Sequence, residues 1–416
     1  MVSKNRMVFN IQESSLKHLF LAAIALLCIL PQLALTAEMP SRENRMVHRD
    51  GNRIVDGDGH PLKLRGVNLG GWLLWEPWMW GGHLLASESK LSSRLESVVG
   101  PEQMAKFRQE VYDNFITEAD IQRISTLGFN VVRVPMNHTI FENGGPGFQI
   151  LDRLLSWADR YHVYVILDLH SAPGGQAKIF TADSDGGKLL WDSPENQSRT
   201  VALWKSIAQR YKDRRIVAGY DLLNEPAPES GQQLFDMDRE IVAGIREVDP
   251  AHMVIVEGSQ YASDFSMFNE LLSPNQAYSF HMYTRKQDNR SEKLAEISRI
   301  SKAQNVPMWC GEFGENNYEM IDSTLALFDN PQNDVDGWAF WTWKRGPAPN
   351  PTLMTFDLPP QWKHVVERDS SPLALGKPKS NETLEAMQQF VQAIRLDHAR
   401  PDPKMTSILT SHLKRQ

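Results

Sequence analysis

Short apolar runs alternate with amphipathic segments along most of the chain, and this alternation constrains the fold more than any other feature. The runs are continuous in hydrophobicity, as parallel strands covered on both faces are. Apolar residues recur at three- and four-residue spacing in the segments between them, which predicts helices. Eight strands, each followed by a helix, predict a single closed (β/α)8 TIM barrel of α/β class with long βα loops. The predicted strands are 63–68, 130–135, 164–170, 217–224, 253–257, 278–283, 307–312 and 337–341.

Helices are predicted between the strands, and the chain is predicted to contain one catalytic domain followed by a tail. We expect residues 51–398 to form the catalytic domain and residues 399–416 to form a peripheral C-terminal tail. The Asp-Gly turn of Asp56–Gly59 lies between two short extended runs, which predicts an N-terminal β-hairpin of 53–55 with 62–65. The predicted helices are 115–127, 150–161, 199–211, 234–248, 262–272, 292–304, 318–328 and 383–394.

The N-terminus is typical of an export signal. Basic residues precede an unbroken apolar run, Leu19 to Leu30, and Leu35-Thr36-Ala37 offers a small-residue cleavage site. We therefore predict that residues 1–37 are a signal peptide and that the protein is secreted or periplasmic. An uncleaved membrane anchor is the alternative, because the run approaches the ~20 residues of a membrane span if it extends to Ala37. We expect residues 38–50 to be a polar, mobile segment.

Charge and cysteine content exclude several other classes of protein. The formal net charge is −7 without a cluster of basic residues, which argues against nucleic-acid binding. The only cysteines are Cys28 and Cys310, so the exported chain would hold one thiol and no internal disulfide. The sequence shows neither a His-Glu-x-x-His motif nor a Cys/His spacing typical of metal sites. We expect no metal and no cofactor.

Two of the apolar runs end in a glutamate, Tyr220-Asp221-Leu222-Leu223-Asn224-Glu225-Pro226 and Trp309-Cys310-Gly311-Glu312-Phe313-Gly314. A carboxylate at the C-terminal end of a barrel strand faces the βα-loop side, where chemistry occurs. Paired carboxylates at one barrel mouth are the groups that cleave glycosidic bonds. The sequence therefore predicts an active site that contains Glu225 and Glu312.

Further polar and aromatic residues fall near the other strand ends. Glu257 closes the fifth strand, where it has either a substrate-side or a structural role. His281 and Tyr283 are two residues apart on the sixth strand and hence lie on one face. The remaining candidates are Arg133, His170, Asn224, Trp341 and Trp343.

Taken in barrel order, these motifs resemble glycoside hydrolase family 5. The resemblance rests on Val132-Arg133-Val134-Pro135, Leu167 to Gln176, Asn224-Glu225-Pro226, His281-x-Tyr283 and Glu312, and it covers roughly residues 54–394. It implies a retaining β-glycosidase in which Glu225 is the acid/base and Glu312 the nucleophile. Other active-site positions of the family match Arg133, His170, Asn224, His281, Tyr283 and Trp341.

Simple electrostatics agrees with these roles. Arg133 and the Tyr283 hydroxyl are expected to keep Glu312 ionised, since a cation and hydrogen bonds to the charged form lower a carboxyl pKa. The negative charge of Glu312 is expected to raise the pKa of Glu225, which must carry a proton at the start of the reaction. His170 and His281 are expected to be neutral positioning groups.

A tryptophan cluster follows the first predicted strand. Four tryptophans lie within the glycine-flanked segment 70–82, which predicts a loop. Indoles are large, stiff platforms for the apolar faces of sugars, so Trp75 is predicted to bind substrate, as is Trp343 at the eighth strand. Trp191 and Trp362 are candidates for further subsites. Plain packing under a long loop is the alternative for any one tryptophan of the cluster.

The leading hypothesis is a monomeric retaining endo-β-1,4-glucanase, a cellulase, that acts on a polysaccharide or oligosaccharide. A β-1,3-glucanase or a β-mannanase remains open, because subsite loops rather than the fold set specificity. An inactive carbohydrate-binding barrel is the alternative of another class, and the intact pair Glu225 and Glu312 argues against it. A membrane would be a partner only if the N-terminal segment is uncleaved.

Overall fold

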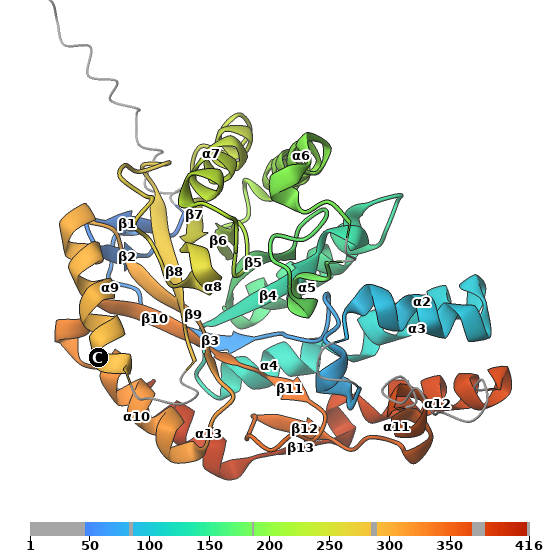
Figure 1. Ribbon diagram of the computed structural model, residues 1–416. Helices are drawn as coiled ribbons and strands as arrows, with labels where there is room; N and C mark the ends of the chain where they lie inside the picture. Colours follow the sequence, from blue (N-terminus) through green and yellow to red (C-terminus); the bar gives the residue numbers. More distant parts are fainter. Residues whose placement is uncertain (1–45, 83–85, 185–186, 284–288, 368–378, 414–416) are drawn as a thin grey trace, which may run out of the picture. The chain divides into compact units, whose positions relative to one another are not determined.

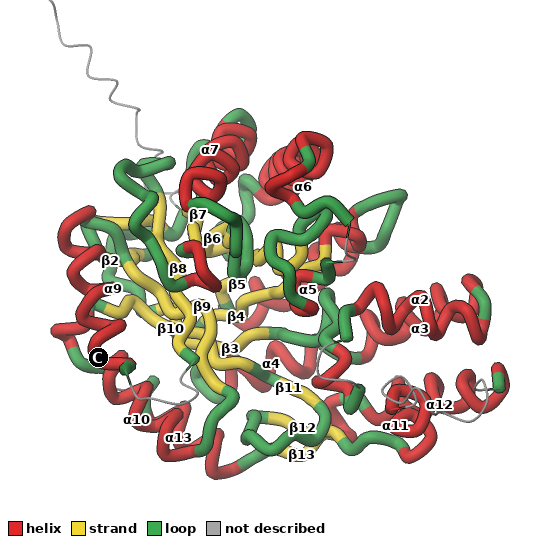
Figure 2. Tube along the Cα trace, viewed as in Figure 1, coloured by secondary structure: helices red, strands yellow, loops and turns green. Residues whose placement is uncertain are grey.

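Eight parallel strands close into a barrel in the computed structural model, which describes residues 46–82, 86–184, 187–283, 289–367 and 379–413. The strand order around the barrel is β10-β3-β4-β5-β6-β7-β8-β9, with helices outside it (Figures 1 and 2). This arrangement confirms the predicted (β/α)8 barrel. The predicted signal peptide or anchor and most of the segment 38–50 lie outside the described residues.

The barrel strands lie where the apolar runs predicted them, and every residue of seven of them is buried, as is all but the first residue of β5. β6 ends at Asp221 rather than at Asn224, because the chain turns there and Glu225 has a φ of 43°. The strands are β3 (Leu64–Asn68), β4 (Val131–Asn137), β5 (Tyr164–Ser171), β6 (Val217–Asp221), β7 (Met253–Glu257), β8 (Gln276–Met282), β9 (Met308–Gly314) and β10 (Val335–Trp341).

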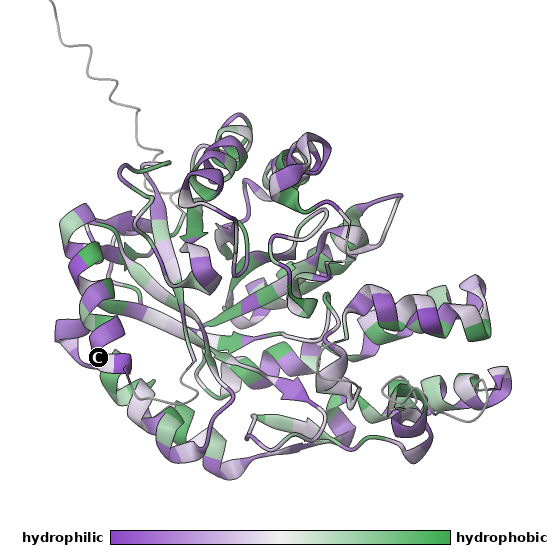
Figure 3. Cartoon of the chain, in the orientation of Figure 1, coloured by the Kyte–Doolittle hydropathy of each residue, from purple (hydrophilic) through white to green (hydrophobic). Residues whose placement is uncertain are grey.

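The outer helices are amphipathic, as their apolar spacing predicted, with polar and apolar residues along each helix in Figure 3. Their starts carry the expected caps, for example the capping box of Ser230 and Gln233 on α7. Within the described ranges, no helix has both the length and the apolar character needed to cross a membrane. The helices that match predicted ones are α4 (Glu118–Thr126), α5 (Gly147–Tyr161), α6 (Pro194–Tyr211), α7 (Gly231–Arg246), α9 (Arg290–Gln304), α10 (Tyr318–Phe328) and α12 (Ser380–Ala393).

The predicted helix 262–272 is wrong. Only a short helix, α8 (Ser259–Ala262), is present, and the chain then turns. The Asp264 side chain accepts a hydrogen bond from the backbone N–H of Ser266, which offers the backbone an alternative to helical pairing. Local side-chain bonding therefore prevails over weak apolar periodicity.

The predicted pairing across the Asp56–Gly59 turn is present in short form: Val55 bridges Pro61 in an antiparallel sense, and the Leu62 N–H donates to the Ile54 carbonyl at 2.9 Å. A second hairpin, which was not predicted, precedes it. β1 (His48–Asp50) pairs with β2 (Arg53–Val55). The Asp56–Gly59 turn follows this hairpin, and the Asp56 carboxylate accepts backbone N–H bonds from Asp58 and His60. Val47 is buried in the same apolar cluster as Leu64 of β3, so the end of the expected mobile segment 38–50 is part of the fold.

Four helices form a lobe beside the barrel (Figure 1), and three of them were not predicted. This helical lobe consists of α2 (Glu88–Val99), α3 (Pro101–Asn114), α11 (Pro360–Glu367) and α12. Its core is aromatic: Trp80, Phe107, Trp362 and Phe390 lie with ring centroids 4.1 to 6.3 Å apart. α2 and α3 bury few residues each, which left only a weak apolar period in the sequence.

The C-terminal segment 399–416 is not a peripheral tail over its described part. β13 (Ala399–Pro401) pairs with β12 (Met354–Phe356), which also pairs with β11 (Lys344–Arg345). α13 (Pro403–Ser411) follows and packs against α10, with Met405 and Leu409 fully buried. The expectation of a peripheral tail is therefore wrong.

We expect Leu409→Ala to lower the free energy of unfolding by about 2–5 kcal/mol, because it removes a fully buried side chain and leaves a cavity. Ser407→Ala, on the exposed face of the same helix, should change it by less than about 0.5 kcal/mol. Urea unfolding monitored by tryptophan fluorescence measures both. Equal midpoints for the two variants would contradict the packing of α13.

Candidate active site

A buried guanidinium organises the C-terminal end of the barrel. Arg133 on β4 is fully buried. Its Nε donates to Asp221 at 2.7 Å, its Nη1 to Glu312 at 2.6 Å and its Nη2 to Glu257 at 3.0 Å. Asp168 lies 3.1 Å from Nη2. One cation therefore gathers carboxylates from four different strands, β5, β6, β7 and β9.

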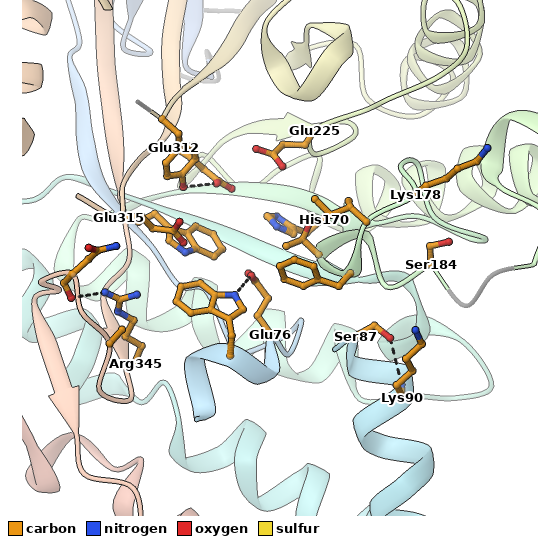
Figure 4. A pocket seen from close by; sticks show the side chains of 18 of the residues that line it. Glu76, Ser87, Lys90, His170, Lys178, Ser184, Glu225, Glu312, Glu315 and Arg345 are labelled. Carbon is orange, nitrogen blue, oxygen red and sulfur yellow. Dashed lines mark hydrogen bonds between the residues drawn. The ribbon is translucent and has the colours of Figure 1, made fainter. Parts of the chain in front are cut away.

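Glu312 lies on β9 with both carboxylate oxygens in hydrogen bonds. Oε1 accepts from Arg133, and Oε2 accepts from the Tyr283 hydroxyl at 2.9 Å. The dashed line at Glu312 in Figure 4 marks the second of these bonds. His281 Nδ1 lies 3.7 Å from Oε2. Both groups that were expected to hold Glu312 in its charged form thus contact it.

Glu225 lies opposite Glu312, just beyond the end of β6. Its left-handed φ of 43° is uncommon for a non-glycine residue. The backbone N–H of Glu225 donates to Glu257 at 2.7 Å, which fixes this turn. A carboxylate oxygen of Glu225, one of Glu312 and a ring nitrogen of His281 all lie within 4.8 Å of one another. The two glutamates predicted to converge are thus adjacent.

His281 is not the neutral residue that we expected. Nδ1 lies 2.9 Å from Glu225 and Nε2 lies 3.2 Å from Glu257. Burial acts to lower the pKa of this imidazole, but the surrounding carboxylates Glu257 and Glu312 raise it well above its ordinary value. The prediction of neutrality failed because Glu257 could not be placed beside His281 from the sequence.

The same imidazolium reverses our expectation for Glu225. Burial acts to raise the pKa of Glu225, but the hydrogen bond from His281 and its charge outweigh burial and hold the pKa below its ordinary value. In the free protein the shared proton therefore lies on His281. The nearby charge of Glu312 does not dominate.

His170 is held from both sides. Nδ1 lies 2.7 Å from Asp168 Oδ2, two residues earlier on the same face of β5, and Nε2 lies 3.2 Å from Asn224 Nδ2. The ring stacks on Trp341, with centroids 5.6 Å apart and planes at 18°. Burial acts to lower the pKa of His170, and Asp168 raises it above the ordinary value. Because Asn224 Oδ1 accepts from Arg133, Asn224 Nδ2 donates to His170 Nε2, which agrees with the expected neutral ring.

These groups open into a cavity of about 1030 Å³ at the βα-loop side of the barrel. His170, Glu225, Tyr283, Glu312 and Trp341 all line it, as predicted. Arg133, Asn224 and His281 lie behind this surface and hold the lining residues through the contacts described above. The other lining residues include Glu76, Trp78, Ser87, Lys90, Lys178, Phe180, Ser184, Leu189, Glu315, Arg345 and Asn350.

Two predicted substrate-binding tryptophans do not line the cavity. Trp75 is buried against Trp80 and Phe107, and Trp343 is buried with its Nε1 donating to Asp120 at 2.9 Å. Trp191 and Trp362, considered as further subsites, are also buried and absent from the lining. These four indoles come from different segments of the chain, and each packs inside the molecule rather than facing the cavity.

Trp78 is the one tryptophan of segment 70–82 that lines the cavity. The Trp78 side chain is only partly buried. The guanidinium of Arg345, on β11, lies 5.3 Å from the centroid of the Trp78 ring. A cation over one face of an indole stabilises the ring while it leaves the other face available.

Several residues of the site were missed in the sequence. Asp221 and Asp168 bind Arg133, Asn68 accepts from Arg133 Nη1 at 3.2 Å, and Gln176 donates to the carbonyls of His170 and Asn224. Asp168 carried a usable signal, because residues two apart on a strand share a face and His170 was already a candidate. Asn68 carried none beyond its place at a strand end.

Two groups of side chains have metal-ligand geometry among the described residues. Glu225, His281 and Glu312 form one, but Arg133 and Tyr283 already occupy the oxygens of Glu312. Asp56, Asp58 and His60 form the other, in the turn after β2. There Asp56 accepts two backbone N–H bonds, which is the geometry of the predicted turn.

Comparison with known proteins identifies the family. Residues 95–346 match the model of Cellulase (glycosyl hydrolase family 5). The chain belongs to this family. It is therefore a glycoside hydrolase, and the strand-end motifs that resembled family 5 are confirmed as a family signature.

Relatives of this family 5 hydrolase differ in their names. "Beta-xylosidase" of Phanerodontia chrysosporium is 31% identical over 338 residues, which is 71% of this chain and 70% of the relative. "Endoglucanase C" of Acetivibrio thermocellus is 28% identical over 61% of this chain and 68% of the relative. The crystal structure of rutinosidase from Aspergillus niger shares the fold, with a TM-score of 0.58 at 20% identity over 68% of this chain and 90% of that one.

We expect the His281 ring to stay protonated at pH values where free histidine, with a pKa near 6.5, is neutral, because two carboxylates favour the charged form. Protonation is measured by NMR of protein labelled with ¹⁵N-histidine, and His281→Asn assigns the signal. Glu257→Gln should lower the His281 pKa, since it removes one of the carboxylates. A neutral ring at pH 7 that is insensitive to this change would contradict the assignment.

Proposed function

We propose that the protein is a retaining β-glucan hydrolase that works by double displacement. The observation that carries this proposal is the approach of Glu225 and Glu312: one carboxylate oxygen of each lies within 4.8 Å of the other. Retaining glycosidases hold their two carboxyl groups ~5–5.5 Å apart, whereas inverting enzymes need ~6.5–9.5 Å to admit a water between them.

In the first step, Glu312 attacks the anomeric carbon of the bound sugar. A bond forms between that carbon and a Glu312 oxygen while the bond to the leaving oxygen breaks. Arg133 and Tyr283 favour this step because their hydrogen bonds to the two oxygens of Glu312 orient its carboxylate. Glu225 delivers a proton to the leaving oxygen, and His281 supplies it through the 2.9 Å contact.

In the second step, a water attacks the anomeric carbon and releases Glu312. Glu225 accepts one proton of the water, and the other stays on the new sugar hydroxyl. The negative charge of Glu312 is absent from the covalent intermediate. The proton taken from water returns to the Glu225–His281 pair, which restores the starting state.

Endo-cleavage of β-1,4-glucan is the first candidate for specificity. The relative named "Endoglucanase C" and the Cellulase family model support it. Trp78 and Trp341 offer two indoles in the lining of a cavity that can hold more than one sugar. Export of the enzyme by residues 1–37 would bring it to such a polymer.

An exo-acting β-glycosidase that removes terminal sugars from short β-linked chains is the second candidate. The 31% identity to the relative named "Beta-xylosidase" favours it. Both candidates use the same two carboxylates, so variants of Glu225 and Glu312 cannot distinguish them. The linkage that is cleaved and the mode of cleavage need a separate test with different substrates. Action on β-1,3-glucan or mannan belongs to the same test.

Glu312→Gln should lose at least about 10⁴-fold in kcat on every substrate, since no nucleophile remains. Glu225→Gln should lose polysaccharide hydrolysis but keep much of its cleavage of aryl β-glycosides with acidic leaving groups, which need little protonation. Release of the aryl alcohol and of reducing ends measures the two activities. Equal losses of Glu225→Gln on both substrates would refute its role as the acid.

On a panel of carboxymethylcellulose, laminarin, mannan and xyloglucan, we expect the fastest release of reducing ends from the cellulose derivative, with a rapid fall in viscosity. Proton NMR of the same digests should show the β-anomer first, before mutarotation. An α-anomer would exclude double displacement. Release of reducing ends without a fall in viscosity would favour the exo-acting candidate instead.

A further inference from the structure

A third glutamate lines the cavity, and neither step of the proposed mechanism uses it. Glu76 is 3% exposed and precedes the short 3-10 helix η2 (Pro77–Trp80). Its Oε2 accepts a hydrogen bond from Trp78 Nε1 at 2.7 Å, drawn in Figure 4. Its Oε1 is buried and has no hydrogen-bond partner among the described residues. Such an atom is costly unless a ligand satisfies it.

The position of Glu76 is fixed by its neighbours in the chain. Trp75 and Trp80 are buried in the aromatic core of the helical lobe, on either side of Glu76 in sequence. The backbone N–H of Trp75 donates to Glu88 Oε2 at 2.9 Å. Glu76 therefore cannot move its carboxyl to solvent without disturbing the packed tryptophans.

The environment keeps Glu76 neutral. Burial raises its pKa to about 8, the charge of His170 and the Trp78 hydrogen bond act to lower it, and the charges of Glu312 and Glu315 raise it. Arg345 also interacts with this carboxyl from β11. Since Oε2 accepts from Trp78, the proton belongs on Oε1. At neutral pH the side chain then presents an O–H donor at the surface of the cavity.

We propose that Glu76 is a specificity-determining residue that donates this hydrogen bond through Oε1 to a hydroxyl oxygen of the sugar bound beside Glu312. The inference rests on the proposed function. Glu76 and Glu312 line the same cavity, and Figure 4 shows both side chains at it. A neutral sugar hydroxyl fits this site, because an anionic group would face Glu312 and Glu315.

Substitution separates this role from a structural one. Glu76→Gln keeps a donor in the place of Oε1 and an acceptor for Trp78, so kcat/KM for an aryl β-glucoside should stay within about threefold of wild type at pH 6.5. Glu76→Ala should lose about tenfold to a hundredfold. Glu102→Gln, on the exposed face of α3, is the matched control for charge removal.

Deoxy sugars identify the hydrogen bond. Among the 3-, 4- and 6-deoxy analogues of the aryl glucoside, one should be cleaved poorly by wild type, while Glu76→Ala cleaves it no worse than the parent glucoside. This non-additivity reports a direct contact. A structural role would instead lower kcat/KM by the same factor for all analogues, and that outcome would overturn the proposal.

The pH profile gives an independent readout. Above about pH 8 the wild-type protein loses the Glu76 proton, so its kcat/KM should fall relative to that of Glu76→Gln, which has no proton to lose there. A constant ratio from pH 6 to 9 would contradict the donor role. If wild type cleaves no β-glycoside at all, the proposed function fails; if it does and the Glu76 variants behave like Glu102→Gln, only this inference fails.

Discussion

The single guanidinium of Arg133 is the interaction on which the site depends. It is fully buried, and the carboxylates of Asp168, Asp221, Glu257 and Glu312 converge on it. One positive charge cannot balance four buried negative ones. Protonation supplies the remainder: burial and Glu257 raise the pKa of Asp221 well above its usual range, and carboxylates raise the pKa values of the two histidines of the site. The barrel mouth is thus a buried network of charged groups around Arg133, and the number of protons it binds depends on that one positive charge. The contacts of this network also fix the positions of Glu225 and Glu312 at its surface.

Much of this arrangement could be predicted from the sequence because strand ends in a parallel barrel share one rim. An apolar run that ends in Asn224-Glu225 or in Glu312 fixes where the carboxylate emerges, whatever the loops do. Protonation could not be predicted in the same way. The charge of His281 depends on Glu257, which lies on the neighbouring strand β7, and the register that brings them to 3.2 Å is a property of the closed barrel.

The tryptophans show the opposite limit. Trp75 and Trp78 are three residues apart in one loop, yet one packs in the core and the other lines the cavity. An indole suits both places, so residue type alone cannot decide between them. Two of the deciding partners, Phe107 and Trp362, come from the helices α3 and α11, which were not predicted, and the third, Phe390, comes from the predicted helix α12. Glu76, between the two tryptophans, was overlooked for the same reason.

The helical lobe brings together a segment from near the start of the barrel sequence and one from after its end. α2 and α3 follow the first barrel strand, whereas α11 and α12 come after the last one. During synthesis the aromatic residues of the first pair have no partners until nearly the whole polypeptide has left the ribosome. Contacts between such distant segments form late in folding. The loop that carries Glu76 packs on this lobe, so we expect it to reach its final position only when the barrel can close. Ligand recognition by Glu76 would then depend on the last stage of folding.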